Sequence, residues 1–222
     1  SCTSHLLGVA SLFLSYTIFV KIASPPKATH LGGPASLRSL RRVWYNGRIA
    51  MKIFEFQFNP KAKSDRFFRV FSFHTPQELE DRGDMYIIGE LENALPGNAT
   101  FLDQLSTLLS QEYYAPEKSN QNAGHRLKNA LKEGNNFLAE ETKKGNVDWL
   151  GNLHLLLLLF VPSGQGYTLY FTKVGGMKLW LSRSGSLVDA SKSIPEKKED
   201  EGSAKVFGNV GSGRIVPQDR IV

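Results

Sequence analysis

The stretch VGGMKLWLSRSGSL, residues 174–187, decides how this chain is interpreted. It indicates the end of one strand, a bend at Gly175-Gly176, a second strand around Leu179–Leu181 and a hairpin turn at Arg183-Ser184-Gly185. Paired glycines favour a sharp bend, because glycine adopts positive φ without steric cost. The stretch contains no Asp, Glu, His or Cys, so it brings no carboxylate, imidazole or thiol of its own to a site.

Further strands are predicted on both sides of this stretch. Before it, residues 152–161 are continuously apolar, which predicts a strand buried on both faces, and residues 167–174 predict the next strand. After it, residues 191–205 indicate a polar loop, and residues 207–222 hold a glycine-rich turn and the start of one more strand.

The earlier part of the domain places three strands before two long helices. Residues 51–58, 67–73 and 85–91 are rich in alternating and aromatic positions, which favours strands. Residues 100–114 and 120–144 carry apolar residues at 3- and 4-residue spacing, which predicts amphipathic helices. Strands, two helices and then strands predict an α+β sandwich, with the helices on one sheet and a second sheet behind it.

The composition fits a single domain, and the charge distribution argues against a nucleic-acid surface. The chain has 222 residues, of which 41% are hydrophobic. Its net charge of +6 comes from the first 50 residues, which hold six of the 27 basic residues and no acid. The other 21 basic residues balance the 21 acids, so we expect no nucleic acid as a partner of the main body.

Residues 1–50 are predicted to be an apolar and basic leader with a linker, and residues 51–222 to be the domain. Residues 6–20 are mostly apolar and end at Lys21, so they predict a possible membrane anchor with the domain in the cytoplasm. Met51 is the first methionine, so a non-native extension is the other interpretation of this leader. The single cysteine, Cys2, excludes an internal disulfide and fits a reducing compartment.

Four local signatures, taken in order, resemble the PPM-type (PP2C-like) protein phosphatase domain. The first is the strand at 85–91 with Gly89-Glu90 where the family ends a strand in Asp-Gly. The second is the second helix, where the family's Ala, Asn and Leu have counterparts in Ala130, Asn135 or Asn136, and Leu138. The third is the apolar run after Gly151, where the family usually has Gly-Thr-Thr.

The fourth signature is the opening stretch, where the family shows Val-Gly-Asp-Ser-Arg, a strand and Arg-x-Gly. Val174 and Gly175 match, and so do Arg183 and Gly185. Three positions depart from the family, with Gly176 in place of Asp, Met177 in place of Ser and Lys178 in place of Arg. The end of the chain, with Gln218-Asp219-Arg220, is similar to the family's Pro-Gly-Asp-Arg turn.

The resemblance implies a PP2C-like α/β-β/α sandwich of two antiparallel sheets flanked by helix pairs. It also implies a phosphatase reaction in which two Mg²⁺ or Mn²⁺ ions activate a water toward phosphoserine or phosphothreonine. The family's later Asp-Gly and Asp-Asn elements would follow Val222, so the domain is expected to be C-terminally incomplete.

The acids that a two-metal centre needs are scarce in this chain. Two neighbouring dications repel and require several carboxylates. The region of the family's first acid offers only Asp65, and Glu90 is the single candidate metal ligand. We therefore expect a pseudophosphatase without a cofactor, which binds a protein or phosphoprotein partner in cytoplasmic signalling. Two alternatives stay open: an active Mg²⁺- or Mn²⁺-dependent phosphatase with displaced or later ligands, and a structural α+β domain with a coincidental likeness.

Other motifs point less clearly to chemistry. Residues 207–214, FGNVGSGR, suggest a phosphate loop with Arg214, but the Lys-Ser/Thr ending and the following helix are missing, which favours a surface turn. His154 lies in an apolar strand and is interpreted as a core or edge residue. Asp103, His125 and Ser106 could form a hydrolase triad only by spatial coincidence.

Overall fold

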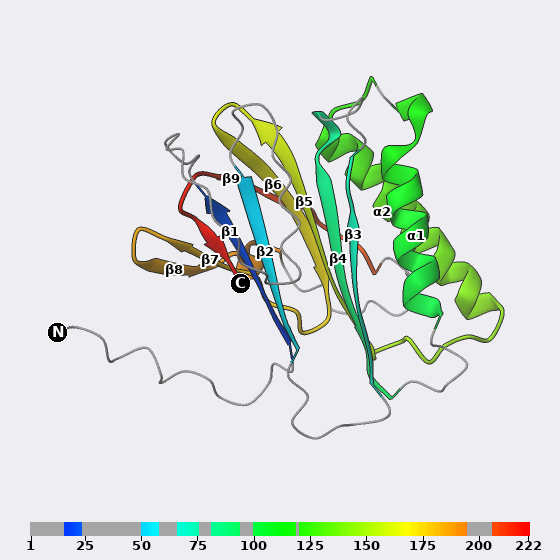
Figure 1. Ribbon diagram of the computed structural model, residues 1–222. Helices are drawn as coiled ribbons and strands as arrows, with labels where there is room; N and C mark the ends of the chain where they lie inside the picture. Colours follow the sequence, from blue (N-terminus) through cyan, green and yellow to red (C-terminus); the bar gives the residue numbers. More distant parts are fainter. Residues whose placement is uncertain are drawn as a thin grey trace, which may run out of the picture.

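The computed structural model describes two antiparallel sheets and two long helices that cover one of them (Figure 1). The described residues are 16–23, 50–57, 66–75, 81–93, 100–118, 120–194 and 206–222. Each sheet has five strands within this part of the chain. The arrangement is the α+β sandwich that the order of strands and helices predicts.

One sheet, here called the helix-covered sheet, has the strand order β3-β4-β5-β6-β9. Its strands are β3 (Phe67–Phe73), β4 (Asp84–Leu91), β5 (Leu153–Ser163), β6 (Gly166–Val174) and β9 (Gly211–Ile215). β5 lies in the middle of this sheet with core on both faces. This position explains why its sequence is apolar without alternation.

Helices α1 (Phe101–Tyr114) and α2 (Ala123–Lys143) pack on one face of this sheet (Figure 1). Asn122 caps α2 by accepting a hydrogen bond from the backbone N–H of His125 at 2.8 Å. α1 comes close to the sheet at Gly89, where an added Cβ would lie 3.0 Å from a methyl carbon of Leu102. The described residues also include the short 3₁₀ helices η3 (Pro116–Lys118) and η4 (Ala190–Ser193).

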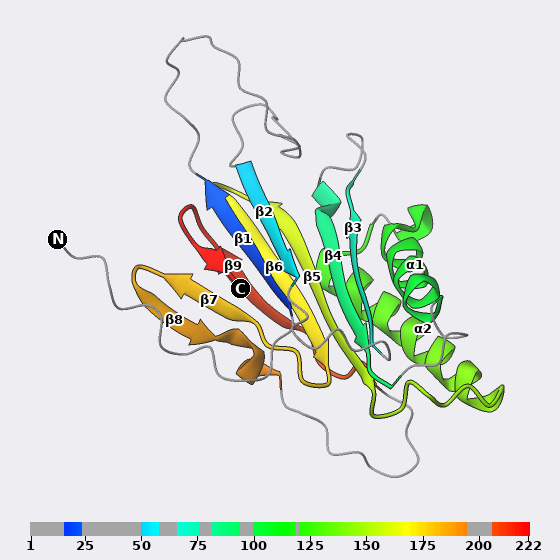
Figure 2. The ribbon, with the colours of Figure 1, turned by 60° about the horizontal axis from the view of Figure 1, so that its bottom comes forward.

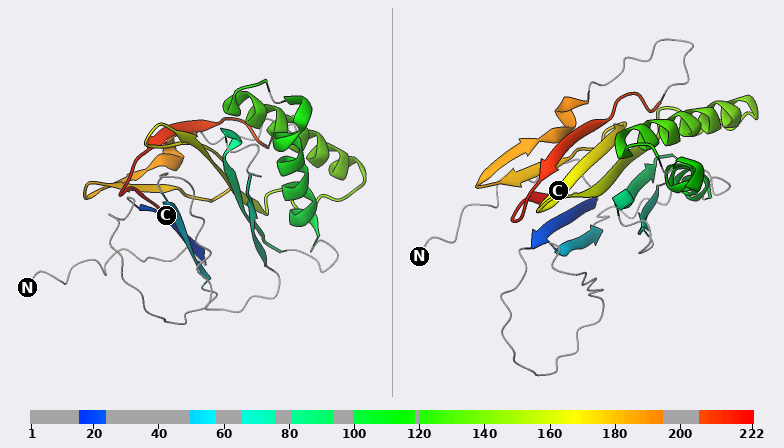
Figure 3. Two further views of the ribbon diagram at one scale, coloured as in Figure 1. Left: turned by 45° about the horizontal axis from the view of Figure 1, so that its top comes forward. Right: turned by 90° about the horizontal axis from the view of Figure 1, so that it is seen from above.

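The second sheet, here called the open sheet, has the order β2-β1-β10-β7-β8. Its strands are β2 (Ala50–Gln57), β1 (Tyr16–Ala23), β10 (Arg220–Ile221), β7 (Trp180–Arg183) and β8 (Ser186–Asp189). In Figure 3 the two helices and the strands β1 and β2 lie on opposite sides of β4. The helix-covered sheet therefore forms the middle layer.

Two hydrophobic cores result from this layering. The helix-side core holds the residues of β4 and β5 that face the helices, including Ile87 and Leu157. The inter-sheet core holds the alternate residues, including Ile88 and Leu156, together with Ile221 of β10 and with Leu179, which directly precedes β7. The side-chain alternation of β4 thus divides its residues between two cores.

β1 was not expected, because its residues overlap the apolar run at 6–20. Tyr16–Ala23 pairs antiparallel with β2 along its whole length and with β10 at Val20 and Lys21. A short apolar run rich in β-branched and aromatic residues is equally compatible with a strand. The open sheet therefore extends across the predicted domain boundary at residue 51. Among the described residues, no helix has the length and apolar character to cross a membrane.

One further expectation differs from the structure. The stretch FGNVGSGR is not a surface turn alone, since Gly211–Ile215 pairs with β6 as the edge strand β9. Glycine fits at 211 because an added Cβ would lie 2.5 Å from the Phe171 ring. The described residues contain one long helix pair, α1 and α2. The predicted linker at 24–48 and most of the loop at 191–205 lie outside the described residues.

Candidate functional site

The opening stretch carries the chain from one sheet to the other. β6 ends at Val174 in the helix-covered sheet, and β7 starts at Trp180 in the open sheet (Figure 2). Gly175 has φ of +65°, and an added Cβ there would lie 2.2 Å from Nδ1 of His154. The backbone N–H of Gly176 donates a hydrogen bond to this same nitrogen at 2.8 Å. The paired glycines therefore make the predicted bend, and they pack directly on β5.

A cluster of polar residues lies beside this bend, on the inter-sheet face of β4 and β5. Glu90 lies two residues from Ile88 on that face and pairs across the sheet with His154. Nη1 of Arg66 lies 3.0 Å from Oε1 of Glu90, and Nη2 of Arg66 lies 2.5 Å from Oε1 of Glu92. We call Arg66, Glu90, Glu92 and His154 the polar cluster.

Arg66 determines the electrostatics of the polar cluster. Glu90 lies near the end of β4 and Glu92 directly follows it, and both carboxylates lie against Arg66, so their negative charges repel. The guanidinium group of Arg66 bridges both carboxylates, one with each terminal nitrogen. The Glu90 side chain is only 13% exposed, so this ion pair is partly shielded from water and strengthened by that shielding.

The hydrogen bond from Gly176 determines the tautomer of His154. Nδ1 accepts the backbone N–H, so in the neutral ring the hydrogen resides on Nε2. Nε2 lies 4.0 Å from Oε2 of Glu92. His154 thus links the bend to the polar cluster, and its role as a satisfied histidine in an apolar strand is confirmed.

The donors of the polar cluster do not fit a two-metal centre. Glu90, the predicted ligand, lies in the inter-sheet layer, but its carboxylate is engaged by Arg66. Throughout the described ranges, no three His, Cys, Asp or Glu side chains are placed to hold a metal ion. Asp65, the other acid that the family pattern suggested, lies outside the described residues.

Arg183 and Gly185 belong to the β7–β8 hairpin. Ser184 and Gly185 have φ of 49° and 81°, which are the paired positive values of a type I′ turn. Nε and Nη2 of Arg183 donate to the two carboxylate oxygens of Asp219 at 2.9 and 2.6 Å. Nη2 also donates to the backbone carbonyl of Arg214 at 2.7 Å, which connects the open sheet to β9.

Asp219 is buried, with only 2% of its side chain exposed. Burial by itself raises the pKa of this carboxyl, but the hydrogen bonds from Arg183 and from the Val216 backbone outweigh burial and hold the pKa below its usual value. The same contact raises the pKa of Arg183. The pair is a clamp between the exposed Arg183 of β7 and the buried Asp219 of the β9–β10 turn, so Arg183 has a structural role here.

The remaining motif positions lie near the bend but make few polar contacts. Val174 ends β6 opposite Leu155, and Gly89 lies beneath α1. Lys178 is exposed between the bend and β7. The structure thus brings Gly175, Gly176 and Glu90 into one region through His154, and it leaves Lys178 outside the polar cluster.

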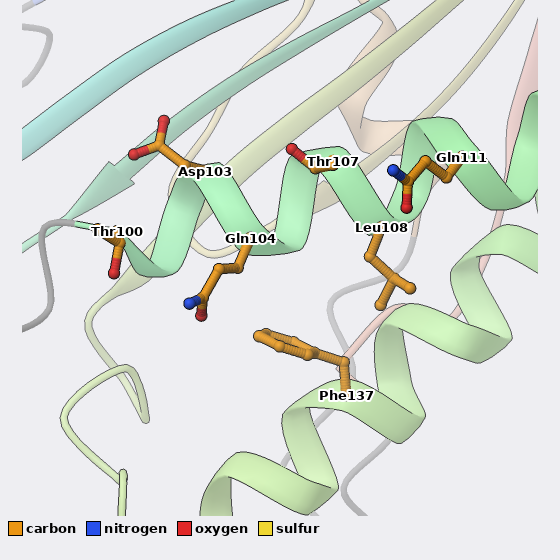
Figure 4. Close-up of a pocket in the computed structure, with 7 residues that line it drawn as sticks. All are labelled: Thr100, Asp103, Gln104, Thr107, Leu108, Gln111 and Phe137. Carbon is orange, nitrogen blue, oxygen red and sulfur yellow. The ribbon is translucent and has the colours of Figure 1, made fainter.

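The suggested hydrolase triad is absent from the described residues. Oγ of Ser106 donates to the backbone carbonyl of Asp103 within α1, while His125 lies in the first turn of α2. A shallow groove of about 570 Å³ lies between the two helices (Figure 4). Its lining is uncharged except for Asp103 and includes no histidine.

Comparisons with known proteins give distant structural matches. No protein-family model matches the chain, and no curated protein matches it. The crystal structure of the Mycobacterium tuberculosis serine/threonine phosphatase PstP/Ppp is 13% identical, with a TM-score of 0.36, and the match covers 70% of this chain and 76% of that one. The crystal structure of the catalytic domain of the serine/threonine protein phosphatase PstP, in complex with two manganese ions, is 14% identical, with a TM-score of 0.36. This match covers 70% of this chain and 75% of that one.

Proposed function

We propose that this chain is a PPM-type phosphatase-like domain that does not hydrolyse phosphate esters and serves as a binding or regulatory module for a protein partner. The order of elements and the motif positions around the bend support the family resemblance. The proposed loss of catalysis rests on one observation, namely that Arg66 bridges Glu90 and Glu92 in the inter-sheet layer.

A guanidinium group and a pair of dications differ in what they can do. Each would neutralise neighbouring carboxylates, and a metal pair would also bind water and lower its pKa. A guanidinium carries hydrogen-bond donors only and has no vacant coordination position for water. Arg66 therefore supplies the positive charge that Glu90 and Glu92 require and supplies no nucleophile.

The position of Gly176 agrees with this interpretation. The family resemblance places an Asp at this position, and an added Cβ at Gly176 would lie 3.7 Å from Nδ1 of His154. A carboxylate at 176 would therefore stand beside the polar cluster. The chain presents a backbone N–H there instead, so the missing acid and the Arg66 bridge occur in the same region.

The alternative is an active metal-dependent phosphatase with displaced ligands. It is favoured by one observation, namely that Glu90, Glu92 and His154 lie at one end of the inter-sheet layer. Removal of Arg66 would leave the carboxylates of Glu90 and Glu92 as two oxygen donors at this position. While Arg66 bridges Glu90 and Glu92, these carboxylates are not available to a metal ion, so removing Arg66 tests the alternative directly.

The test combines hydrolysis of p-nitrophenyl phosphate with Mn²⁺ titration calorimetry of the full chain. We expect the unsubstituted chain to show no turnover and no Mn²⁺ binding at millimolar concentration. Arg66→Gln removes the bridge and is expected to gain weak Mn²⁺ binding. Arg69→Gln is the matched control, because Arg69 is an exposed arginine on β3 that contacts neither carboxylate.

One result would establish the alternative in place of the proposal. It is Mn²⁺-dependent turnover by the unsubstituted chain that Glu90→Gln abolishes and Arg69→Gln leaves intact. The Glu90→Gln substitution retains the shape of the side chain and removes its charge, so a loss of turnover would report the role of the carboxylate. Circular dichroism of each variant checks that it is folded.

A further inference from the structure

β3 forms one edge of the helix-covered sheet. It pairs with β4 from Phe67 to Phe73, and no strand of the described part of the chain pairs with its other side. Figure 2 shows β3 as the outermost strand of this sheet. Such an edge presents backbone N–H and C=O groups that another strand can pair with.

The residues of β3 do little to protect this edge. Its sequence is FFRVFSF, in which four of seven residues are phenylalanine and Arg69 is the only charge. The other edges are short or carry polar and glycine residues: β8 has four residues, β9 is GSGRI, and β2 includes Lys52 and Glu55. A long apolar edge strand with a single charge, and with no bulge in its pairing with β4, is a site for strand pairing.

Both hydrophobic cores reach this edge. Phe67, Phe71 and Phe73 pack against the helix-side core, and Phe68 and Val70 pack against the inter-sheet core. All five side chains are only partly buried. A further strand beside β3 would extend both cores at once, which adds apolar burial to the backbone hydrogen bonds.

We propose that β3 pairs antiparallel with β3 of a second copy of this chain, about a two-fold axis at Val70. In this register Val70 meets Val70, Arg69 meets Phe71, Phe68 meets Ser72, and Phe67 meets Phe73. No like charges oppose one another, and Arg69 lies beside an aromatic ring, which is a favourable cross-strand pair.

The proposed pairing keeps both layers in place. A two-fold axis perpendicular to the sheet puts helices beside helices and the inter-sheet face beside the inter-sheet face. The sequence of β3 is also compatible with pairing to an identical strand, because Arg69 of one copy lies opposite Phe71 and not opposite Arg69 of the other copy. This self-complementarity favours a second copy over an unrelated peptide as the occupant.

Cysteine cross-linking tests the register. In a Cys2→Ser background, which removes the only native cysteine, Val70→Cys places two thiols opposite each other at the axis. Directly opposed Cβ atoms lie about 4.5–5.5 Å apart, close enough for a disulfide after a small shift. We expect a covalent dimer on mild oxidation. The control is Ser186→Cys on the exposed edge of β8, which is expected to stay monomeric.

Sedimentation equilibrium of the unsubstituted chain tests the interface without the Val70 substitution. We expect a dimer, and we expect Ser72→Lys to raise its dissociation constant at least tenfold, because the new charge opposes Phe68 of the second copy. Ser72 is exposed, so this variant is expected to fold. A monomer at all concentrations overturns the proposal. So does a dimer that Ser72→Lys does not weaken, or one that cross-links only through Ser186→Cys.

Discussion

The backbone N–H of Gly176 donates a hydrogen bond to Nδ1 of His154 at 2.8 Å, and this contact holds the bend between the two sheets against β5. The close packing that makes the bond possible also restricts the neighbouring position. At Gly175 an added Cβ would lie 2.2 Å from the same nitrogen and 2.8 Å from the carbonyl oxygen of Leu153.

We therefore predict that Gly175→Ala lowers the free energy of unfolding by about 3 kcal/mol, because it combines a steric clash with a left-handed backbone. Gly176→Ala is the matched control, since the nearest atom to its added Cβ lies at 3.7 Å. It is expected to cost less than about 1 kcal/mol. Urea unfolding of both variants measures the difference. Equal midpoints would show that the bend is not constrained by His154.

The Arg183–Asp219 clamp predicts a pH dependence of stability. The folded-state pKa of Asp219 lies below its ordinary value, so the clamp contributes fully above the unfolded-state pKa of about 4. Its contribution is lost as the pH falls through the lower, folded-state pKa. Asp219→Asn should therefore destabilise the domain at pH 7, and the difference from the unsubstituted chain should shrink in acid.

Urea unfolding between pH 2 and pH 7 measures this difference. Arg183→Gln leaves the buried carboxylate without its cation and is expected to cost about 1 kcal/mol at neutral pH, because water screens the half-exposed guanidinium group. Asp81→Asn is the control, because Asp81 is exposed. A destabilisation by Asp219→Asn that persists unchanged at pH 2 would contradict this explanation.

The buried hydroxyl group of Tyr113 is expected to contribute to stability through its hydrogen bonds. It donates to the backbone carbonyl of Arg82 at 2.6 Å, and Nη2 of the buried Arg126 donates to this hydroxyl at 3.4 Å. Tyr113→Phe leaves both groups without this partner, and we expect a loss of about 1–3 kcal/mol in unfolding free energy. Tyr170→Phe, at a half-buried position of β6, is expected to cost less than about 0.5 kcal/mol. Similar costs for the two variants would contradict the role of the hydroxyl.

The strands and helices between residues 67 and 174 could be predicted from the sequence because their patterns are local. The β3 segment was placed at residues 67–73, where the structure has it, and the bend at 175–176 follows from two adjacent glycines. β9 was missed because three glycines at positions 208, 211 and 213 suggest a turn. The reason for Gly211 is the Phe171 ring, which lies 40 positions earlier in the chain and gives no local signal.

The polar cluster was found only in part. Glu90 was identified through the family pattern, whereas Glu92 and Arg66 were not. The spacing of Glu90 and Glu92 could have indicated two carboxylates on one face of a strand. No sequence rule pairs Arg66 with them, since that contact depends on the register between β3 and β4. The register is a property of the folded sheet.

The order of the open sheet has a consequence for how the molecule reaches its native state. β10 lies between β1 and β7, so Val20 pairs with Ile221 although the two residues are far apart in the sequence. Contacts of such sequence separation form slowly, because a long loop must close first. The hairpins of the helix-covered sheet are local, so on a ribosome they are free to assemble early, whereas the open sheet must wait for β10 to emerge from the exit tunnel.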